Sequence, residues 1–383
     1  MIKMIRGSLS IATIMLGVAL VVSRSATADR AAGETPGGLQ LKLDKYWEAS
    51  EHAPFGRVQL AYLSNDRLAI SFPTRNRKPE LSSRLSRRNG TYLFKTVFVD
   101  PHSGVVAAQH EWGDYHGSNE LLSVANGRFV VIDEDAIQLY GHDVELIAVH
   151  PLEKVKKIPH FKVLVSPSGH RVYVFQPGEP GTDNVIVLDT GRLNLVAKLT
   201  VPSGLIPSVN EDGIVYKASG TESQFVKLLL SGKKSIISLP GSVSCGNVPT
   251  FISESRLVIS GGCPSLVLIN ANGEMIKKIN IDRRTLGTIT PVNKSIFCTE
   301  TYDFRKGNAA LDISPSVDDP HLICLDALTL SATADIPLTL AHQDHVGPTV
   351  AVAPDASTIA MYTRQEVSII PLNQAEVPVQ GKK

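Results

Sequence analysis

The chain has 383 residues, of which 43% are hydrophobic and 20% are charged, so it can bury a sizeable core and is not a disordered polyelectrolyte. Its 38 basic residues nearly balance its 37 acidic residues, which excludes a protein that binds polyanions over its whole surface. The length would suit two or three ordinary domains, although a large all-β domain can span it as one unit.

The first 28 residues are predicted to be a secretory signal peptide. Lys3 and Arg6 give a positive start, and the apolar run Ile11–Val22 follows them. Small residues at 26–28 (A-T-A) then offer a cleavage site. The alternative is an uncleaved anchor, but the run is shorter than the roughly 20 residues that a spanning helix needs. We therefore expect an exported protein, secreted or periplasmic, with no membrane span after cleavage.

The rest of the chain repeats one pattern, which is a short β run, a two-residue polar turn and a second β run. The first example is "LAYLSNDRLAISF". Asn, Asp, Ser and Gly tolerate the positive φ that tight hairpins need, so each turn predicts a β-hairpin. The seven turns are Asn65-Asp66, Asn126-Gly127, Ser168-Gly169, Asp212-Gly213, Glu254-Ser255, Asn293-Lys294 and Asp355-Ala356.

The spacing of these turns predicts a β-propeller. Successive turns lie 61, 42, 44, 42, 39 and 62 residues apart. A period of about 40–45 residues with four strands per repeat is typical of propeller blades. The two long intervals contain insertions between the second and third strands, at Pro73–Gly90 in the first unit and Asp303–Pro320 in the sixth.

The seventh unit lacks a fourth strand, because only a polar tail follows "EVSIIPLN". The segment "LQLKLDKYW", Leu39–Trp47, has Leu at every second position near its start and can supply that strand. An N-terminal strand in the last blade closes the ring and removes an exposed edge. We therefore predict an all-β, seven-bladed β-propeller with four-stranded antiparallel blades. The predicted organisation is a signal peptide at 1–28, a flexible segment at 29–38, the propeller at 39–373 and a polar tail at 374–383.

The third unit, Val163–Pro202, contains "VSPSGHRVYVF" and "NVIVLDTGRLNLVAKLTVP". These stretches resemble the YVTN-type, WD-like β-propeller repeat, with its pattern SPDG-x-x-x-YV followed by V-x-VIDT. A second, weaker match is "VAPDASTIAMY", where Ala356 replaces the usual Gly. The clear match covers about one blade, so the resemblance implies the fold and leaves the function open. The family includes binding modules, lactonase-like enzymes and cofactor dehydrogenase subunits.

Four cysteines in an exported chain favour disulfides, and none of them forms a CxxC pair. Cys245 precedes the first strand of the fifth unit, and Cys263 lies in its connection between strands two and three. These two segments share a face in a propeller blade. We therefore expect a bridge between Cys245 and Cys263.

A second bridge is predicted in the sixth unit. If Thr301 on the second strand pairs with His321 on the third, the antiparallel register places Cys298 opposite Cys324. Side chains that face each other in this way lie close enough for a disulfide. The alternative is a pair of buried free thiols that pack as small hydrophobic groups.

The first insertion, "PTRNRKPELSSRLSRRNG", carries six cations and one acid, Glu80. It would suit an acidic partner, an anionic glycan or a phosphate surface, and the alternative is a solvated insertion without a target. We exclude nucleic acid, because export separates the protein from it and no aromatic residues interleave the cations. The candidate binding residues here are Arg75, Arg77, Lys78, Arg84, Arg87 and Arg88.

The second insertion is expected on the same face. Tyr302, Phe304 and Arg305 are candidate contact residues in it, because aromatic and Arg side chains dominate protein interfaces. The alternative is a loop that packs over its own blade.

Two segments combine histidines with acids and were considered as metal sites. "AHQDHVG" contains His342 and His345, and "QHEWGDYHG" contains His110 and His116. Both are expected in linkers between units, where imidazole and carboxylate groups can bind a metal. No helix fixes their spacing, so the pattern favours ordinary polar loops.

Enzymatic function finds little support in the sequence. A metal-dependent lactonase on this fold would need Glu, Asp and Asn in the central channel, but Glu120 is the one carboxylate near the starts of the first strands. There is no G-x-S-x-G nucleophile elbow and no Gly-rich loop that would cradle a nucleotide.

We therefore expect an exported binding or scaffolding module that uses the loop face with the insertions 73–90 and 303–320. The alternative is a lactonase-like hydrolase or lyase with its site at the central channel mouth. Arg and aromatic residues in the loops favour the binding module. The expected partner is a protein or an anionic glycan, the protein is expected to be a monomer, and no cofactor, metal or catalytic residue is predicted.

Overall fold

A computed structural model describes the chain in thirteen segments. They are residues 38–42, 58–75, 92–114, 121–133, 136–152, 162–220, 224–239, 248–260, 265–281, 285–305, 316–338, 349–363 and 366–372. The chain divides into two units, Met1–Gly38 and Leu39–Lys383, and the second unit contains the strands described below. No helix with the length and hydrophobicity that a membrane crossing requires occurs in the described segments.

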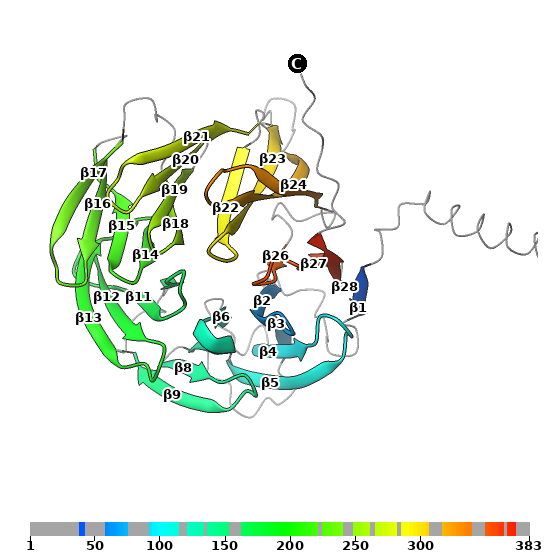
Figure 1. Cartoon of the computed structure of the whole chain (residues 1–383). Helices are drawn as coiled ribbons and strands as arrows, with labels where there is room; N and C mark the ends of the chain where they lie inside the picture. The colour runs from blue at the N-terminus through cyan, green and yellow to red at the C-terminus, as the bar shows by residue number, and fades with distance from the viewer. Residues whose placement is uncertain are drawn as a thin grey trace, which may run out of the picture. The chain divides into compact units, whose positions relative to one another are not determined.

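The second unit is an all-β, seven-bladed propeller, as the sequence predicts (Figure 1). Each blade is a four-stranded antiparallel sheet, and the strands of one blade follow one another in the chain except in blade 7. Besides strands, the described segments contain one 3-10 turn, η3 (Ala125–Gly127), at the first hairpin of blade 2.

The strands of the first four blades have the following bounds. Blade 1 consists of β2 (Gln59–Ser64), β3 (Arg67–Arg75), β4 (Tyr92–Val99) and β5 (Val106–Asp114). Blade 2 consists of β6 (Leu121–Ser123), β7 (Phe129–Asp133), β8 (Ala136–Tyr140) and β9 (Leu146–Pro151). Blade 3 consists of β10 (Lys162–Val165), β11 (Arg171–Pro177), β12 (Thr182–Asp189) and β13 (Leu195–Pro202). Blade 4 consists of β14 (Ser208–Asn210), β15 (Gly213–Lys217), β16 (Gln224–Leu229) and β17 (Lys234–Ser238).

The remaining three blades complete the ring. Blade 5 consists of β18 (Val248–Ser253), β19 (Arg256–Ser260), β20 (Ser265–Asn270) and β21 (Met275–Asn280). Blade 6 consists of β22 (Thr285–Pro291), β23 (Ile296–Arg305), β24 (Ser316–Asp326) and β25 (Ala332–Pro337). Blade 7 consists of β26 (Thr349–Val352), β27 (Thr358–Thr363), β28 (Glu366–Pro371) and β1 (Leu39–Lys42).

The hydrophobic core lies between the blades. Each of seven clusters of buried hydrophobic side chains contains residues from two neighbouring blades. In β11, for example, Val172 and Val174 pack toward blade 2, whereas Tyr173 and Phe175 pack toward blade 4. Successive side chains of a strand point to opposite faces of the sheet, so an inner strand is apolar on both faces. This explains the continuous apolar runs in the second and third strands.

The ring is closed by the N-terminal strand, as predicted. β1 pairs antiparallel with β28, and Leu39 and Leu41 lie opposite Ile369 and Val367. Leu41 is buried in the cluster between blades 7 and 1. The outer edge of β28 is therefore covered by a strand from the other end of the chain.

The second predicted disulfide is present. Thr301 pairs with His321, and Cys298 lies opposite Cys324 in the same register. The two cysteines form a disulfide with a Cα–Cα distance of 4.0 Å. Cys245 and Cys263 lie outside the described residues, so their bridge remains a prediction.

The first insertion begins as a strand, and the second begins and ends as one, so these parts of the two insertions are not loops. Pro73 and Arg75 continue β3 and pair with Phe94 and Tyr92 of β4. β2 begins at Gln59, so β3 has a described partner on only one side beyond Ser71. Pro73 thus lies where β3 has a described neighbour on only one side, and a strand with one free side tolerates proline. Residues 303–305 and 316–318 of the second insertion likewise extend β23 and β24 as a pair.

Candidate functional site

The connections of the propeller fall on two opposite faces. The turns between the first and second strands lie on one face, which we name the turn face. The connections between the second and third strands, including both insertions, lie on the other, which we name the insertion face. This division follows from the antiparallel strand order in every blade.

On the insertion face, two hairpin stems project from blades 1 and 6, which flank blade 7. Arg75 is the last residue of β3, at the end of the first stem. The other predicted binding residues of this segment, Arg77, Lys78, Arg84, Arg87 and Arg88, lie outside the described residues.

The second group of predicted contact residues lies in a strand. Tyr302, Phe304 and Arg305 belong to the strand β23, and not to a loop as the sequence predicts. Tyr302 is half-buried and lies opposite Thr285 of β22, and Arg305 pairs with Ser316 at the end of the second stem. The described ends of the two stems, Arg75 and Arg305, therefore share a face but lie on separate blades.

The predicted linker around His110 is a strand. His110 belongs to β5, and its ring lies on that of Trp112, with centroids 4.0 Å apart. Burial disfavours the charged imidazole and lowers the pKa of His110. Glu111 points to the other face of β5 and lies 3.8 Å from Lys95 Nζ.

This strand geometry separates His110 from Glu111, so the two do not converge as ligands. His116, His342 and His345 lie outside the described residues. In the described segments, no group of three His, Cys, Asp or Glu residues is arranged to hold a metal ion.

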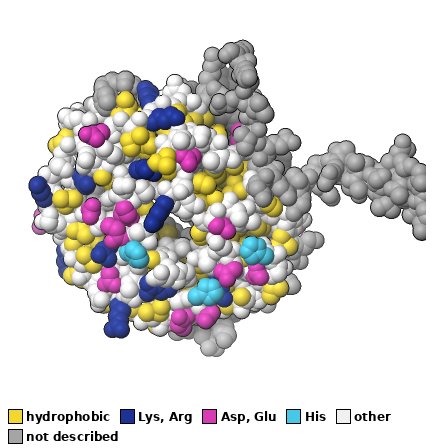
Figure 2. Space-filling model, viewed as in Figure 1, with side chains coloured by type: hydrophobic (Ala, Val, Ile, Leu, Met, Phe, Trp, Pro, Cys, Tyr) yellow, Lys and Arg dark blue, Asp and Glu magenta, His cyan; other side chains and the backbone are white. Residues whose placement is uncertain are grey.

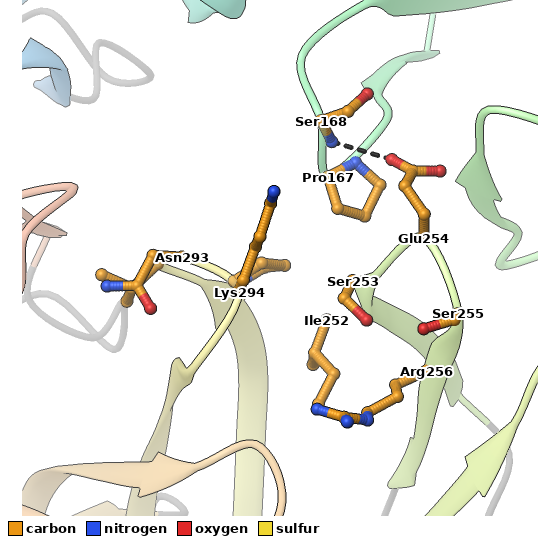
Figure 3. A pocket seen from close by; sticks show the side chains of 11 residues that line it. Pro167, Ser168, Ile252, Ser253, Glu254, Ser255, Arg256, Asn293 and Lys294 are labelled. Atoms are coloured by element: carbon orange, nitrogen blue, oxygen red, sulfur yellow. Dashed lines mark hydrogen bonds between the residues drawn. The ribbon is translucent and has the colours of Figure 1, made fainter.

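The turn face contains a cavity of about 420 Å³. It is lined by the first hairpin turns of three blades, at residues 167–168 of blade 3, 252–256 of blade 5 and 291–294 of blade 6 (Figure 3). Figure 2 shows a hollow at the centre of the ring, with acidic and basic side chains around its rim.

Glu254 joins three turns on one side of this cavity. Its Oε1 accepts the backbone N–H of Ser168 at 2.8 Å, and its Oε2 accepts that of Glu211 at 2.6 Å. Its own carbonyl oxygen accepts a hydrogen bond from Asn210 Nδ2 at 2.9 Å. Hydrogen bonds to a carboxylate are stronger than neutral ones. The Glu254 side chain therefore holds blades 3, 4 and 5 together at the channel.

Both carboxylate oxygens of Glu211 also have partners within the protein. Its Oε1 accepts hydrogen bonds from the hydroxyl groups of Ser166, at 3.3 Å, and Ser168. Its Oε2 lies 3.6 Å from Arg171 Nε. The negative charges on this side of the cavity are thus balanced by donors from the protein.

The opposite side of the cavity is different. Arg256 is half-buried and Lys294 is exposed, and neither side chain makes a hydrogen bond or an ion pair within 4 Å with a described residue. Arg256 is nevertheless close enough to Asp326 to help lower the pKa of that carboxyl group. Ser253 Oγ is buried without a hydrogen-bond partner among the described residues. In Figure 3, the Arg256 side chain runs beneath Ile252, and Lys294 extends toward the turn at Pro167 and Ser168.

The cavity lies beside two neighbouring blades whose first turns are not hydrogen-bonded to each other. At other junctions, the first turns are joined by hydrogen bonds, such as Ala125 N–H to Gly169 O at 3.0 Å and Asn293 Nδ2 to Pro354 O at 2.9 Å. Between the first turns of blades 5 and 6, the described residues form no such bond. A gap therefore remains between Glu254 and Lys294.

The sequence analysis missed this site. It identified Ser168, Glu254 and Lys294 only as residues that form turns. A usable signal was Lys294, which is the one basic residue among the seven predicted turn pairs. Because all first turns meet on one face, charged side chains there converge on the channel.

Comparisons with known proteins support the fold. No protein-family model matches this chain, and no curated protein sequence matches it. The solved structure of U3-55K is 10% identical, with a TM-score of 0.51 over 84% of this chain and 99% of that one. A catalytically inactive virginiamycin B lyase from Staphylococcus aureus, determined with quinupristin, is 11% identical, with a TM-score of 0.50 over 88% and 99%.

A third structure, Kluyveromyces lactis Hsv2, is 10% identical over 80% of this chain and 93% of that one, with a TM-score of 0.48. At such identities the likeness concerns the fold alone. The chain is a β-propeller protein, and its membership of the YVTN-type family remains a prediction.

Proposed function

We propose that this protein is an exported binding module that holds an acidic partner on its insertion face. The observation that carries this proposal is the pair of hairpin stems on that face. β3 and β4 pair as far as Arg75 and Tyr92, and β23 and β24 pair as far as Arg305 and Ser316. A paired stem holds the residues at its end more firmly than a free loop would.

The charge of the first insertion defines the partner. Residues 73–90 contain six cations and one acid in a chain whose charges nearly balance as a whole. Five of the six are Arg, whose planar guanidinium group binds carboxylates in a bidentate manner. We therefore favour a protein with an acidic surface as the partner.

Export is supported by the Cys298–Cys324 disulfide. Disulfides persist in oxidising compartments and are rare in the cytosol. The predicted signal peptide at residues 1–28 leads to the same compartment.

The alternative, a hydrolase or lyase at the channel mouth, is favoured by no specific observation. Glu254 lines the turn-face cavity, but both of its carboxylate oxygens accept backbone N–H groups. A general acid or base must reach the proton that it transfers. We therefore keep the binding module as the proposed function.

The test compares three variants of the mature protein, residues 29–383, in capture from the exported fraction. The first replaces residues 76–91 by Asn-Gly, because a two-residue turn fits between the paired Arg75 and Tyr92. The second keeps the length and changes the six cations of the first insertion to Gln. The matched control replaces residues 306–315 by Asn-Gly between Arg305 and Ser316.

We expect the wild type and the matched control to retain an acidic protein that the two other variants lose. Retention should weaken as salt rises, because exposed charge contacts are screened. Equal capture by the wild type and the Gln variant would contradict the proposal. Retention of a sulfated glycan in place of a protein would assign the face to a different class of partner.

A further inference from the structure

We propose that the turn-face cavity is a second binding site, which takes a small molecule bearing one oxyanion group, a carboxylate or a phosphate. The site lies on the face opposite the insertions. It therefore stands independently of the function proposed above.

The two cations of the cavity are available to a ligand. Arg256 and Lys294 make no hydrogen bond or ion pair within 4 Å with described residues, although Arg256 is half-buried and feels the charge of Asp326 at longer range. A partly desolvated guanidinium group is stabilised by an anion that it can bond. Lys294 is exposed and extends toward the turn at Pro167 and Ser168 (Figure 3), so its charge attracts an anion from solvent.

A neutral donor completes the anion site. Ser253 Oγ is buried and has no partner among the described residues, and Ser253 lines the same cavity. Buried polar atoms in folded proteins almost always have a hydrogen-bond partner. A ligand oxygen would supply the missing acceptor.

The acid of the cavity does not compete for these cations. Glu254 already accepts two backbone N–H groups, and it is held on the side of blades 3 and 4. The lining thus carries two positive charges, from Arg256 and Lys294, and one negative charge, from Glu254. Asp326 acts on Arg256 from outside the lining, and its Oδ1 already accepts the backbone N–H groups of Leu328 and Thr329. The charges of the lining itself fit a ligand with a single negative charge.

The walls of the cavity suit the uncharged part of such a ligand. Pro167, Ile252, Pro291 and Val292 contribute apolar surface to the lining. The volume of about 420 Å³ lies within the range of small-molecule pockets. A molecule with one oxyanion and a compact apolar body would therefore fill the site.

Benzoate and inorganic phosphate are the probes, and isothermal titration calorimetry of the mature protein is the measurement. We expect benzoate to bind at one site, and its neutral analogue benzamide to bind about tenfold more weakly or not at all. Whichever of the two anions binds more tightly identifies the oxyanion, a carboxylate or a phosphate.

The variants locate the site. We expect Arg256→Gln to weaken benzoate binding about tenfold and Lys294→Gln about threefold, since each removes a charge-assisted contact. Lys234→Gln, which removes a cation from the exposed outer strand of blade 4, serves as the matched control and should leave the affinity unchanged. Because Lys294 is exposed, its replacement tests the site even if the Arg256 variant folds poorly.

The proposal is overturned if neither anion binds, or if Lys234→Gln weakens binding as much as Lys294→Gln does. Equal binding of benzamide and benzoate would overturn it as well. The variant in which Asn-Gly replaces residues 76–91 should bind benzoate like the wild type. A loss of partner capture with unchanged anion binding would therefore separate the two proposals.

Discussion

Blades 6 and 7 are neighbours, but they are held together in different ways. Blade 6 is one continuous stretch of chain, and a disulfide joins its two central strands. Blade 7 is assembled from the two ends of the propeller, and hydrogen bonds and apolar contacts alone attach β1 to it.

The disulfide of blade 6 and the strand β1 lie in hydrophobic clusters on opposite faces of blade 7. Cys298 and Cys324 belong to the hydrophobic cluster that contains Ile359 and Met361 of blade 7. Leu41 belongs to the cluster between blade 7 and blade 1. Blade 7 therefore packs against a covalently fixed sheet on one side and completes the closure of the ring on the other. We therefore expect a substitution that disrupts β1 to lower the free energy of unfolding more than removal of the disulfide does.

The largest effect is expected from Leu41→Asp. A charge at this buried position loses the apolar contacts of Leu41 and has no partner in the cluster, so we expect a loss of about 3–5 kcal/mol in the free energy of unfolding. Urea unfolding followed by fluorescence measures it. Gln40→Asp adds the same charge at the neighbouring, exposed position of β1 and should change stability by less than about 0.5 kcal/mol. Equal losses in the two variants would contradict the role of β1 in closure.

The second-largest loss of stability is expected from removal of the disulfide in blade 6. The Cys298–Cys324 bridge closes a loop with a sequence separation of 26, for which chain entropy predicts about 3 kcal/mol of stabilisation. The double variant Cys298→Ala/Cys324→Ala removes this bridge and keeps Cys245 and Cys263. Urea unfolding without reductant should show the loss. A double variant as stable as the wild type would mean that packing against blade 7 alone fixes blade 6.

Much of this architecture could be predicted because it depends on local rules. The turn residues marked each blade, and Ala356 shows how firmly the turn is encoded, since it adopts a φ of 58° where Gly169 has 74°. Once Thr301 is paired with His321, the antiparallel register of β23 and β24 places Cys298 opposite Cys324, as the structure confirms. The alternation of Leu residues in β1 was sufficient to predict closure.

The turn-face cavity could not be predicted in the same way. Ser168, Glu254 and Lys294 are far apart in the sequence, and the cavity exists because their turns meet without filling the space. Whether two neighbouring turns bond to each other depends on side-chain directions that no periodicity records. The extension of β23 through Phe304 and Arg305 was missed because residues 303–320 were assigned to a loop, although pairing continues to Arg305 and Ser316.

A smaller effect is expected at the closing junction. Tyr62 Oη of blade 1 lies 3.0 Å from Thr358 Oγ1 of blade 7, and Tyr62 is buried. We expect Tyr62→Phe to cost about 1 kcal/mol near neutral pH. Thr358→Val removes the same bond from the other side, and a double-mutant cycle should show that the two losses are not additive. Strict additivity would mean that the bond contributes nothing.

Tyr62 also makes the stability of the junction between blades 7 and 1 depend on pH in the alkaline range. Burial of the hydroxyl group raises the pKa of Tyr62 to about 12, from an ordinary value near 10. The unfolded chain therefore loses this proton first, and the stability that Tyr62 contributes falls as pH rises from about 10 to 12. The difference in unfolding free energy between wild type and Tyr62→Phe should shrink above pH 10. A constant difference up to pH 11 would contradict this burial.

The smallest effect lies on the blade 6 side of the comparison, at Glu300. This residue shares the face of β23 with Cys298, toward blade 7, and burial raises the pKa of its carboxyl group. A Cβ atom at Gly287 would lie 3.1 Å from Glu300 Cβ, so the glycine leaves room for this side chain.

Because the folded chain holds the Glu300 proton more tightly than the unfolded chain, stability falls as pH rises from the unfolded pKa, about 4.3, to the raised folded value. Glu300→Gln cannot ionise and should escape this fall. We therefore expect the variant to gain stability relative to wild type between pH 4 and pH 7, measured by urea unfolding at each pH. If the difference in unfolding free energy between wild type and Glu300→Gln does not change with pH, the Glu300 carboxylate is solvated in the folded protein. The junction between blades 6 and 7 would then rest on the disulfide and its apolar neighbours alone.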